Sequence, residues 1–421
     1  MPGFNCFLST ISSLRAVFIC AFSLSLVVPT AAHAQSLSLP GAIAAAFAEN
    51  PDLAAAQWEI GVAQGDRQQA GLMPNPVISW EAEDTRRQTS TTTVMLSQEL
   101  ELGGKRGARI GAASIGQRAA QIEFERRGNE LRAEVVQAFY AALRAQAGLE
   151  LARQSLSLAQ RGVQVAEGRV RAGKSSPVEA TRAQVQLAET QLLVRRAETL
   201  KTNGYRDLAR VTGAATVAFD TLEYSALSPG QAPPAAKLLA AISQSAPLRL
   251  AQAQIEKSAA TLELERAQRI PNVTASIGSQ YSREDRQRVN VVGVSLPLAL
   301  FDRNQGNVLA ASRRADQAQD LRNAVELALL TQTQSALAQW AGAAKDVDAF
   351  DRVILPSAKG ALDAATRGFE MGKFGFLEVL DAQRTLIAAR SQYLDALAIA
   401  ADARVTIERI FGDLAPFNSH P

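Results

Sequence analysis

Residues 149–177 read LELARQSLSLAQRGVQVAEGRVRAGKSSP and end a segment of 69 residues, Gly104 to Ala172, that contains no proline. At 1.5 Å per residue, this segment predicts a helix roughly 100 Å long. Residues 173–177 then mark a turn, because glycine commonly ends a helix and proline commonly begins one. The sequence therefore predicts one very long helix followed by a reversal of the chain.

A seven-residue pattern runs through the second half of this predicted helix. A strict repeat of seven corresponds to 3.5 residues per turn and predicts a left-handed supercoil with neighbouring helices. Alanine at the second position of the seam lets those helices approach closely. The large aliphatic positions are Leu149, Leu156, Val163 and Val170, and the alanines are Ala152, Ala159 and Ala166.

The pattern occurs a second time, 199 residues later, and ends at a second turn that begins with Gly372-Lys373. Turn and proline signals recur at a nearly constant offset along the whole chain, which predicts a tandem duplication. Two rods of this length suit a protein that spans a distance better than a compact soluble enzyme. The matching pairs are Pro51 and Pro247, Pro74 and Pro271, Gly107 and Gly306, Gly173 and Gly372, and Gly213 and Gly412.

Each repeat also contains a pair of alternating segments, expected as β-hairpins over residues 77–102 and 273–300. The segments are about ten residues long, with apolar side chains on one face and polar ones on the other, which is typical of membrane β-barrels. Four strands cannot close a barrel, and open edges are not tolerated in lipid, so several copies must share their hairpins. The alternative is a small sheet packed on the helices of its own chain.

These signals divide the chain into an export signal, two repeats and two connecting pieces. The first repeat contains a helical hairpin over 104–210, and the second contains one over 303–411. The expected fold class is mainly α with a small antiparallel β part. The expected ranges are 1–34 for the signal peptide, 35–227 and 235–412 for the repeats, 228–234 for the linker, and 413–421 for a C-terminal tail.

The composition and the N-terminus exclude several classes of function. Arg15, an apolar run over 16–28 and Ala32-His33-Ala34 predict a signal peptide cleaved between Ala34 and Gln35. Of 44 basic residues the signal holds one, so the mature chain has 43 basic and 41 acidic residues and no cysteine. This balance argues against nucleic-acid binding. With His420 as its one remaining histidine, the mature chain predicts no structural metal site, no cofactor and no catalysis.

The duplicated plan and its motifs resemble the TolC family of outer membrane efflux proteins over nearly the whole mature chain. The motifs are Pro74-Asn75-Pro76 before the first hairpin, the turns at 171–174 and 370–373, and the segment 369–385. The resemblance implies a homotrimer in the outer membrane lipid of a Gram-negative bacterium. Its 12-strand β-barrel continues into a 12-helix tunnel through the periplasm. The sequence most resembles the branch that serves heavy-metal pumps of the resistance-nodulation-division (RND) class.

The two helical turns are expected to be the periplasmic tips. The resemblance implies that they contact a periplasmic adaptor protein, which connects the duct to an inner membrane RND transporter. Residues 168–175 match the phosphate-loop pattern G-x-x-x-x-G-K-S, but that motif needs a preceding strand, whereas a heptad helix precedes it here. The adaptor-contacting candidates are Gly173, Lys174, Ser175, Gly372, Lys373 and Phe374.

Two acidic residues near the second tip are the candidates for a channel constriction. Glu378 and Asp381 lie three positions apart and share a helix face, and the resemblance implies that such a pair lines the tunnel mouth. The first repeat keeps Glu179 but has Arg182 in place of the second acid, so a carboxylate ring is expected from the second repeat alone. The alternative is that these acids simply favour the start of a helix.

Two further features concern opening of the tunnel. Phe369 and Phe374 stand where many members of the family carry polar residues, which argues against a closed gate held by hydrogen bonds. Pro356 has no partner in the first long helix, and an interior proline kinks a helix. Both a hinge that bends during opening and a static kink fit this position.

The sequence therefore predicts the outer membrane exit duct of a tripartite RND-type pump that exports heavy-metal cations without doing chemistry. A second interpretation is the exit duct of a type I secretion or drug efflux system. A third, from another class, is a non-conducting periplasmic coiled-coil scaffold.

Overall fold

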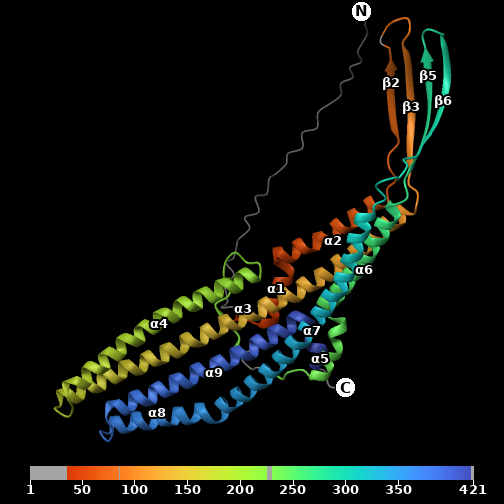
Figure 1. Ribbon diagram of the computed structural model, residues 1–421. Coiled ribbons are helices and arrows are strands. Elements are labelled where there is room, and N and C mark those ends of the chain that lie inside the picture. The colour runs from red at the N-terminus through yellow and green to blue at the C-terminus, as the bar shows by residue number, and fades with distance from the viewer. Residues whose placement is uncertain (1–35, 85, 225–229, 419–421) are drawn as a thin grey trace, which may run out of the picture.

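The computed structural model describes residues 36–84, 86–224 and 230–418. The predicted signal peptide, its cleavage site at Ala34 and Gln35, and parts of the predicted linker and tail lie outside these residues. The chain is elongated, with a four-stranded sheet at one end and long helices extending to the other (Figure 1). No helix among the described residues is long and apolar enough to cross a membrane.

Each repeat consists of shorter helices, a β-hairpin and a long helical hairpin, in that order. Helix α3 runs unbroken for 67 residues, as the proline-free segment predicts. In the first repeat the helices are α1 (Leu39–Glu49), α2 (Pro51–Ala70), α3 (Lys105–Arg171) and α4 (Pro177–Val211). In the second they are α5 (Ala235–Ala241), α6 (Ala246–Gln268), α7 (Gln305–Ala349), α8 (Leu355–Glu370), α9 (Phe376–Phe411) and α10 (Ala415–Asn418).

The sheet joins the two repeats through its central strands. Strands β2 (Val77–Glu83), β3 (Thr91–Leu100), β5 (Val273–Ser282) and β6 (Gln287–Ser295) are antiparallel in the order β2-β3-β5-β6. Strands β2 and β6 are the edges, and neither has a further partner within the described chain. The sheet is therefore open on both sides.

Strand β6 is shorter than the sequence predicted. It ends at Ser295, although the alternation of apolar residues continues to Leu300. Pro297 follows two residues later, and proline has no backbone N–H to donate to a neighbouring strand. The ladder therefore stops before it, and residues 296–300 connect the sheet to α7 without strand structure.

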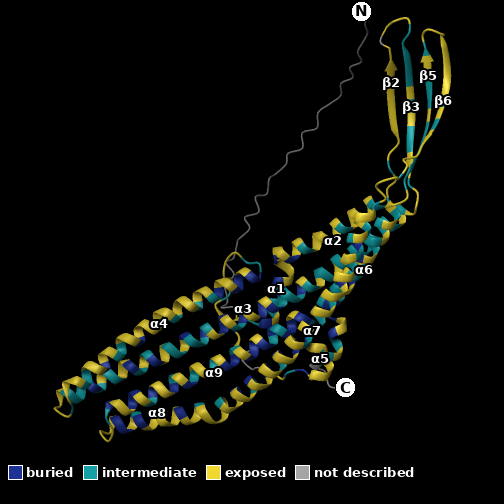
Figure 2. Cartoon of the chain, in the orientation of Figure 1, coloured by how far each residue is buried: buried dark blue, intermediate teal, exposed yellow. Residues whose placement is uncertain are grey.

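One face of the sheet carries a row of large apolar side chains that crosses all four strands. Ile78, Leu96, Ile277 and Val292 pair in register across all four strands, and all four are exposed. The sheet projects away from the helices, and most of its strand residues are exposed or intermediate rather than buried (Figure 2). The alternative of a sheet packed on its own helices is therefore wrong.

Four helices lie side by side from the middle of the chain to its far end (Figure 1). Helix α3 packs on α4 within the first repeat and on α9 of the second, and α9 packs in turn on α8. Closer to the sheet, α2 packs on α3, and α6 lies between α3 and α7. The spatial order at the far end is α4, α3, α9, α8.

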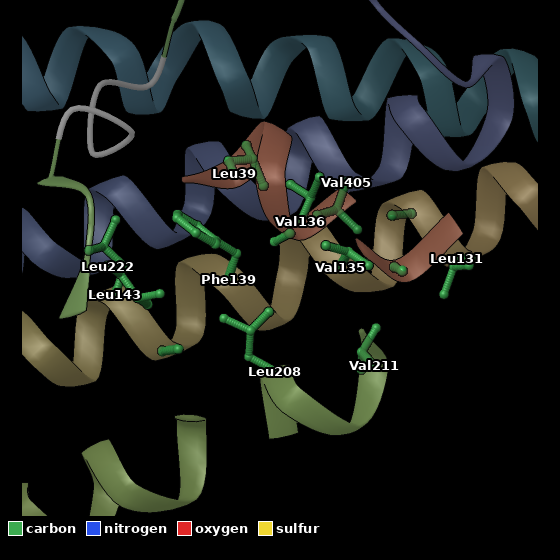
Figure 3. Packing of buried hydrophobic residues seen from close by; sticks show 14 of the residues in the cluster. Leu39, Leu131, Val135, Val136, Phe139, Leu143, Leu208, Val211, Leu222 and Val405 are labelled. Atoms are coloured by element: carbon green, nitrogen blue, oxygen red, sulfur yellow. The ribbon is translucent and has the colours of Figure 1, made fainter. Parts of the chain in front are cut away.

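The main hydrophobic core lies midway along α3. Phe139 and Leu143 on α3 are fully buried against Leu39 on α1 and Leu208 on α4 (Figure 3). Two short parallel strands, β1 (Ser36–Leu37) and β4 (Thr221–Leu222), cover this core. Leu222 is held there because the Gln146 side chain donates to its carbonyl at 3.1 Å and accepts from its amide at 2.9 Å.

The second long helix is interrupted where the sequence placed Pro356. Residues Phe350–Ile354 form one π-helical turn between α7 and α8, and the Leu355 amide donates to the Phe350 carbonyl five residues back. Proline lacks the amide that would bond to the fourth preceding carbonyl, and its ring crowds that carbonyl. The wider turn relieves this crowding, so the structure has a defined defect at this point.

Candidate functional site

Both helical tips end in the same backbone motif. In the first tip Gly173 has φ +69°, its amide donates to the Val170 carbonyl at 3.0 Å, and the Lys174 amide donates to Arg169 at 2.8 Å. Gly372 has φ +75°, and the second tip makes the corresponding two bonds at 3.0 and 2.8 Å. This is the Schellman arrangement, which favours glycine at the left-handed position. Residues 168–171 are helical, so the phosphate-loop pattern has no phosphate-loop structure.

The side chains of the two tips differ. Lys174 and Lys373 are exposed, and Ser175 is half-buried. Phe374 stands where the first tip has Ser175, and its ring lies directly on Gly368, where an added Cβ would come within 2.2 Å of the ring. The six candidate tip residues therefore form one polar turn and one turn with a fixed, half-exposed aromatic ring. Their contact with an adaptor stays a prediction.

The two hairpins of one chain touch near their tips. Arg169 on α3 places its guanidinium 4.9 Å from the centre of the Phe369 ring and donates to the Phe369 carbonyl at 3.0 Å. Phe376 packs on Phe369, with 5.5 Å between ring centres. Gly162 faces Phe376 so closely that an added Cβ would lie 3.1 Å from its ring. A phenylalanine at position 369 therefore does not prevent a hydrogen bond between the two hairpins, because its backbone carbonyl accepts the bond from Arg169.

The predicted constriction residues Glu378 and Asp381 lie in the first two turns of α9, and their role at a constriction stays a prediction. Glu378 is exposed, and its Oε2 lies 2.9 Å from where a Cβ on Gly375 would stand, so its carboxylate folds back over the start of α9. This position suits an acidic residue in the first helical turn, because the N-terminus of a helix carries partial positive charge. Asp381 is also exposed but lies on the side of α9 that faces α4.

Asp381 lines a groove of about 700 Å³ between α4 and α9. The groove has three apolar residues on α4, two on α9 and a balanced set of charges, with two arginines and two carboxylates. Arg182 and Glu189 come from α4, and Asp381 and Arg384 come from α9. All four are exposed, and none makes an ion pair within the part of the chain that is described. The apolar members are Pro177, Val178, Val185, Leu377 and Leu380, with Ala183 and Val379 packed beneath.

The internal repeat explains which residues meet in this groove. Val178 and Leu377, Arg182 and Asp381, and Val185 and Arg384 are each separated by 199 residues, the offset of the duplication. Corresponding positions of the two repeats therefore face one another across the groove. The acidic pattern near the second tip pointed to Asp381 and to its counterpart Arg182 but not to Arg384, which the same offset and helical spacing also predict for this face.

The polar face of the sheet carries a second set of charges that the sequence analysis did not select. Glu81, Glu83 and Glu99 all lie on this face, and no lysine or arginine does within the described strands. The Asn272 side chain donates to Glu99 at 2.6 Å and holds its carboxylate at the base of the sheet. Within the described strands this face therefore carries negative charge near both ends of the first hairpin and no positive charge.

The described residues contain no group of three or more His, Cys, Asp or Glu side chains arranged to hold a metal ion. What the geometry offers is surface charge: an acidic sheet face at one end and a charge-balanced groove at the other. Such surfaces act on ions through the electrostatic potential along a path rather than through coordination.

Comparisons with known proteins agree with this architecture. The family model for outer membrane efflux proteins matches residues 42–214 and 238–413, one match in each repeat. The chain is 37% identical over 377 residues to the cobalt-zinc-cadmium resistance protein CzcC of Cupriavidus metallidurans, covering 89% of this chain and 90% of that protein. It is 29% identical to the nickel-cobalt-cadmium resistance protein NccC of Alcaligenes xylosoxydans xylosoxydans, covering 68% and 66%.

Solved structures show the same fold. A crystal structure of CusC, described in terms of folding and transmembrane channel formation, superimposes with a TM-score of 0.74 at 18% identity and covers 89% of this chain and 92% of its own. Family match, relatives and fold all coincide over both repeats. The chain therefore belongs to the outer membrane efflux protein family.

Proposed function

We propose that this chain is the outer membrane exit duct of a tripartite RND-type pump that exports heavy-metal cations. In this proposal three copies form the duct, a periplasmic adaptor contacts the tips, and an inner membrane RND transporter drives transport. The family, the resistance relatives and the long helical hairpins support it. The duct extends from the outer membrane into the periplasm.

The open sheet carries the proposal. Its edges β2 and β6 have no partner within the described chain, and its apolar face is exposed. Unpaired strand edges are unstable in lipid unless other strands complete them, and an exposed apolar face is unstable in water but stable against lipid. Pairing β6 of one copy with β2 of the next closes a barrel. Three copies supply twelve strands, enough to leave an aqueous lumen, whereas eight strands would be filled by side chains.

The acidic sheet face fits a cationic cargo. If the apolar face contacts lipid, Glu81, Glu83 and Glu99 point into the lumen, and three copies contribute nine carboxylates. A lumen with one sign of charge raises the local concentration of the opposite ion. CzcC and NccC are named for resistance to cobalt, zinc, cadmium and nickel, which supports divalent metal cations as the cargo.

Two measurements test this proposal. Purified protein in planar bilayers should conduct and should prefer potassium to chloride, and exchange of all three glutamates for glutamine should reduce that preference. A protein that assembles but never conducts would support the non-conducting scaffold instead. A strain that lacks the gene should lose tolerance to zinc, cobalt or cadmium. Unchanged metal tolerance with loss of a secreted protein or of drug tolerance would support a type I secretion or drug efflux duct.

A further inference from the structure

We infer that Arg182, with Arg384 in the same groove, keeps the periplasmic mouth of the duct from trapping the cations that pass through it. This inference rests on the proposed function and concerns one step of it, the release of cargo from the entrance. It comes from the groove between α4 and α9, in which an arginine stands where the duplication would otherwise place a second aspartate.

The positions are fixed by helical spacing and by the repeat. On α4, Val178, Arg182 and Val185 follow one another at intervals of four and three residues, so they share one face. The residues 199 positions later share the corresponding face of α9, and all six line one groove near the tips. Arg182 and Asp381 are therefore corresponding residues of opposite charge in one cavity.

The charges are free to act on a passing ion. Arg182, Asp381 and Arg384 are all exposed, and within the described residues none of them is taken up in an ion pair with a neighbour. The groove as a whole is balanced, because Glu189 adds a second carboxylate to the two arginines and one aspartate. A divalent cation entering here meets no net excess of negative charge.

A groove with aspartate in place of Arg182 alone would behave differently. Aspartate at position 182 would join Asp381 and Glu189, so each groove would hold three carboxylates and one arginine, and a trimer would hold nine such carboxylates. Closely spaced carboxylates hold divalent cations strongly, and conduction requires that an ion leave its site as readily as it enters. For a duct whose cargo is itself divalent, such a ring would hold the cargo in place.

The test compares block by zinc ions in planar bilayers. Wild-type protein, Arg182→Asp and the double variant Arg182→Asp with Asp381→Asn are reconstituted as the assembled oligomer, and potassium current is recorded as zinc is added on the tip side. Arg206→Asp, an exposed position further along α4 and outside the groove, is the matched control with the same change of charge. Size-exclusion chromatography confirms that each variant assembles.

We expect the half-blocking zinc concentration of Arg182→Asp to fall about ten-fold or more below that of the wild type, since three new carboxylates replace three arginines beside those of Asp381 and Glu189. The double variant should return close to the wild type, and Arg206→Asp should not differ from it. Equal block of Arg182→Asp and the wild type would overturn the inference. So would block that persists in the double variant, because Asp381 would then not share the site. A wild-type protein that assembles without conducting would instead overturn the proposed duct function.

Discussion

Arg169 and Phe369 join the two helical hairpins of one chain, with the guanidinium 4.9 Å from the ring centre and a 3.0 Å hydrogen bond to the Phe369 carbonyl. The duplication does not reproduce this contact at the corresponding positions of the two repeats. The residue that corresponds to Arg169 is Gly368, and the one that corresponds to Phe369 is Val170. The contact therefore belongs to the seam within one chain and cannot form between chains.

Substitution of Arg169 by glutamine should loosen this seam. The variant loses the cation–π contact and the bond to the Phe369 carbonyl, which together contribute on the order of 1 kcal/mol at a half-exposed site. Amide hydrogen exchange over residues 369–376 should become faster. Arg171→Gln, at an exposed position two residues along, is the control. A double-mutant cycle of Arg169→Gln with Phe369→Leu that shows no coupling would contradict the contact.

Removal of the Glu408 carboxylate should destabilise the middle of the chain strongly. Glu408 is fully buried and accepts hydrogen bonds from Arg404 at 2.7 Å and from Arg132 at 3.3 Å. Glu408→Ala leaves two arginines without this partner and should cost about 3–5 kcal/mol in the free energy of unfolding. Asp413→Ala removes a half-exposed partner of Arg132 and should cost less than about 1 kcal/mol. Denaturant unfolding measures both, and similar losses would show that burial is not the cause.

The free energy of unfolding should decrease at low pH because of Glu101, which lies just below the sheet. A hydrogen-bonded pair with Arg109 lowers the pKa of Glu101 below its ordinary value of 4.5. Because the folded-state pKa is lowered, the stabilisation is complete above pH 4.5 and is lost as the pH falls through the lowered pKa. The melting temperature of the wild type should exceed that of Glu101→Gln at pH 7, and the difference should shrink in acid. A constant difference would exclude this linkage, and Glu263→Gln, on an exposed ion pair, should show no comparable effect.

Exchange of Pro356 for alanine should restore a regular helix through the π turn. Alanine supplies the missing amide, so bonding to the fourth preceding carbonyl becomes possible. The sequence has no cysteine after Cys20, which favours spin labels at Gln339 and Asp363, on either side of the turn. The distance between them should increase toward about 36 Å, the length of a straight helix of that span. If the turn is a hinge, metal tolerance should fall as well, whereas a straightened variant with full tolerance would establish a static kink.

Short-range sequence signals predicted the helices, turns and strands, because neighbouring residues largely determine these elements. The absence of proline between Gly104 and Ala172 indicated an unbroken helix, and α3 covers nearly that whole range. Gly173 and Gly372 indicated the two turns, and both adopt positive φ. Alternation indicated the strands, but Pro297 ends β6 before the alternation itself ends.

Contacts between distant segments could not be read from the sequence in the same way. The approach of Arg169 to Phe369 depends on how α3 packs on the second hairpin, and no local pattern encodes that packing. The folding back of Glu378 over Gly375 depends on the conformation of its side chain, which no sequence pattern specifies. The groove that brings Arg182 to Asp381 was accessible in principle, since the offset of 199 residues pairs them, but only a structure shows that the paired faces meet.

The unpaired edges of β2 and β6 determine how the protein must assemble after it is made. A newly exported chain displays two rows of unsatisfied amides and carbonyls, and any strand it meets can occupy them. One chain therefore cannot complete its maturation alone, and the rate of assembly must depend on the concentration of newly made copies. Rapid synthesis then favours wrongly paired oligomers. A chaperone that covers these edges until the other copies arrive would be as important for yield as the sequence of the chain itself.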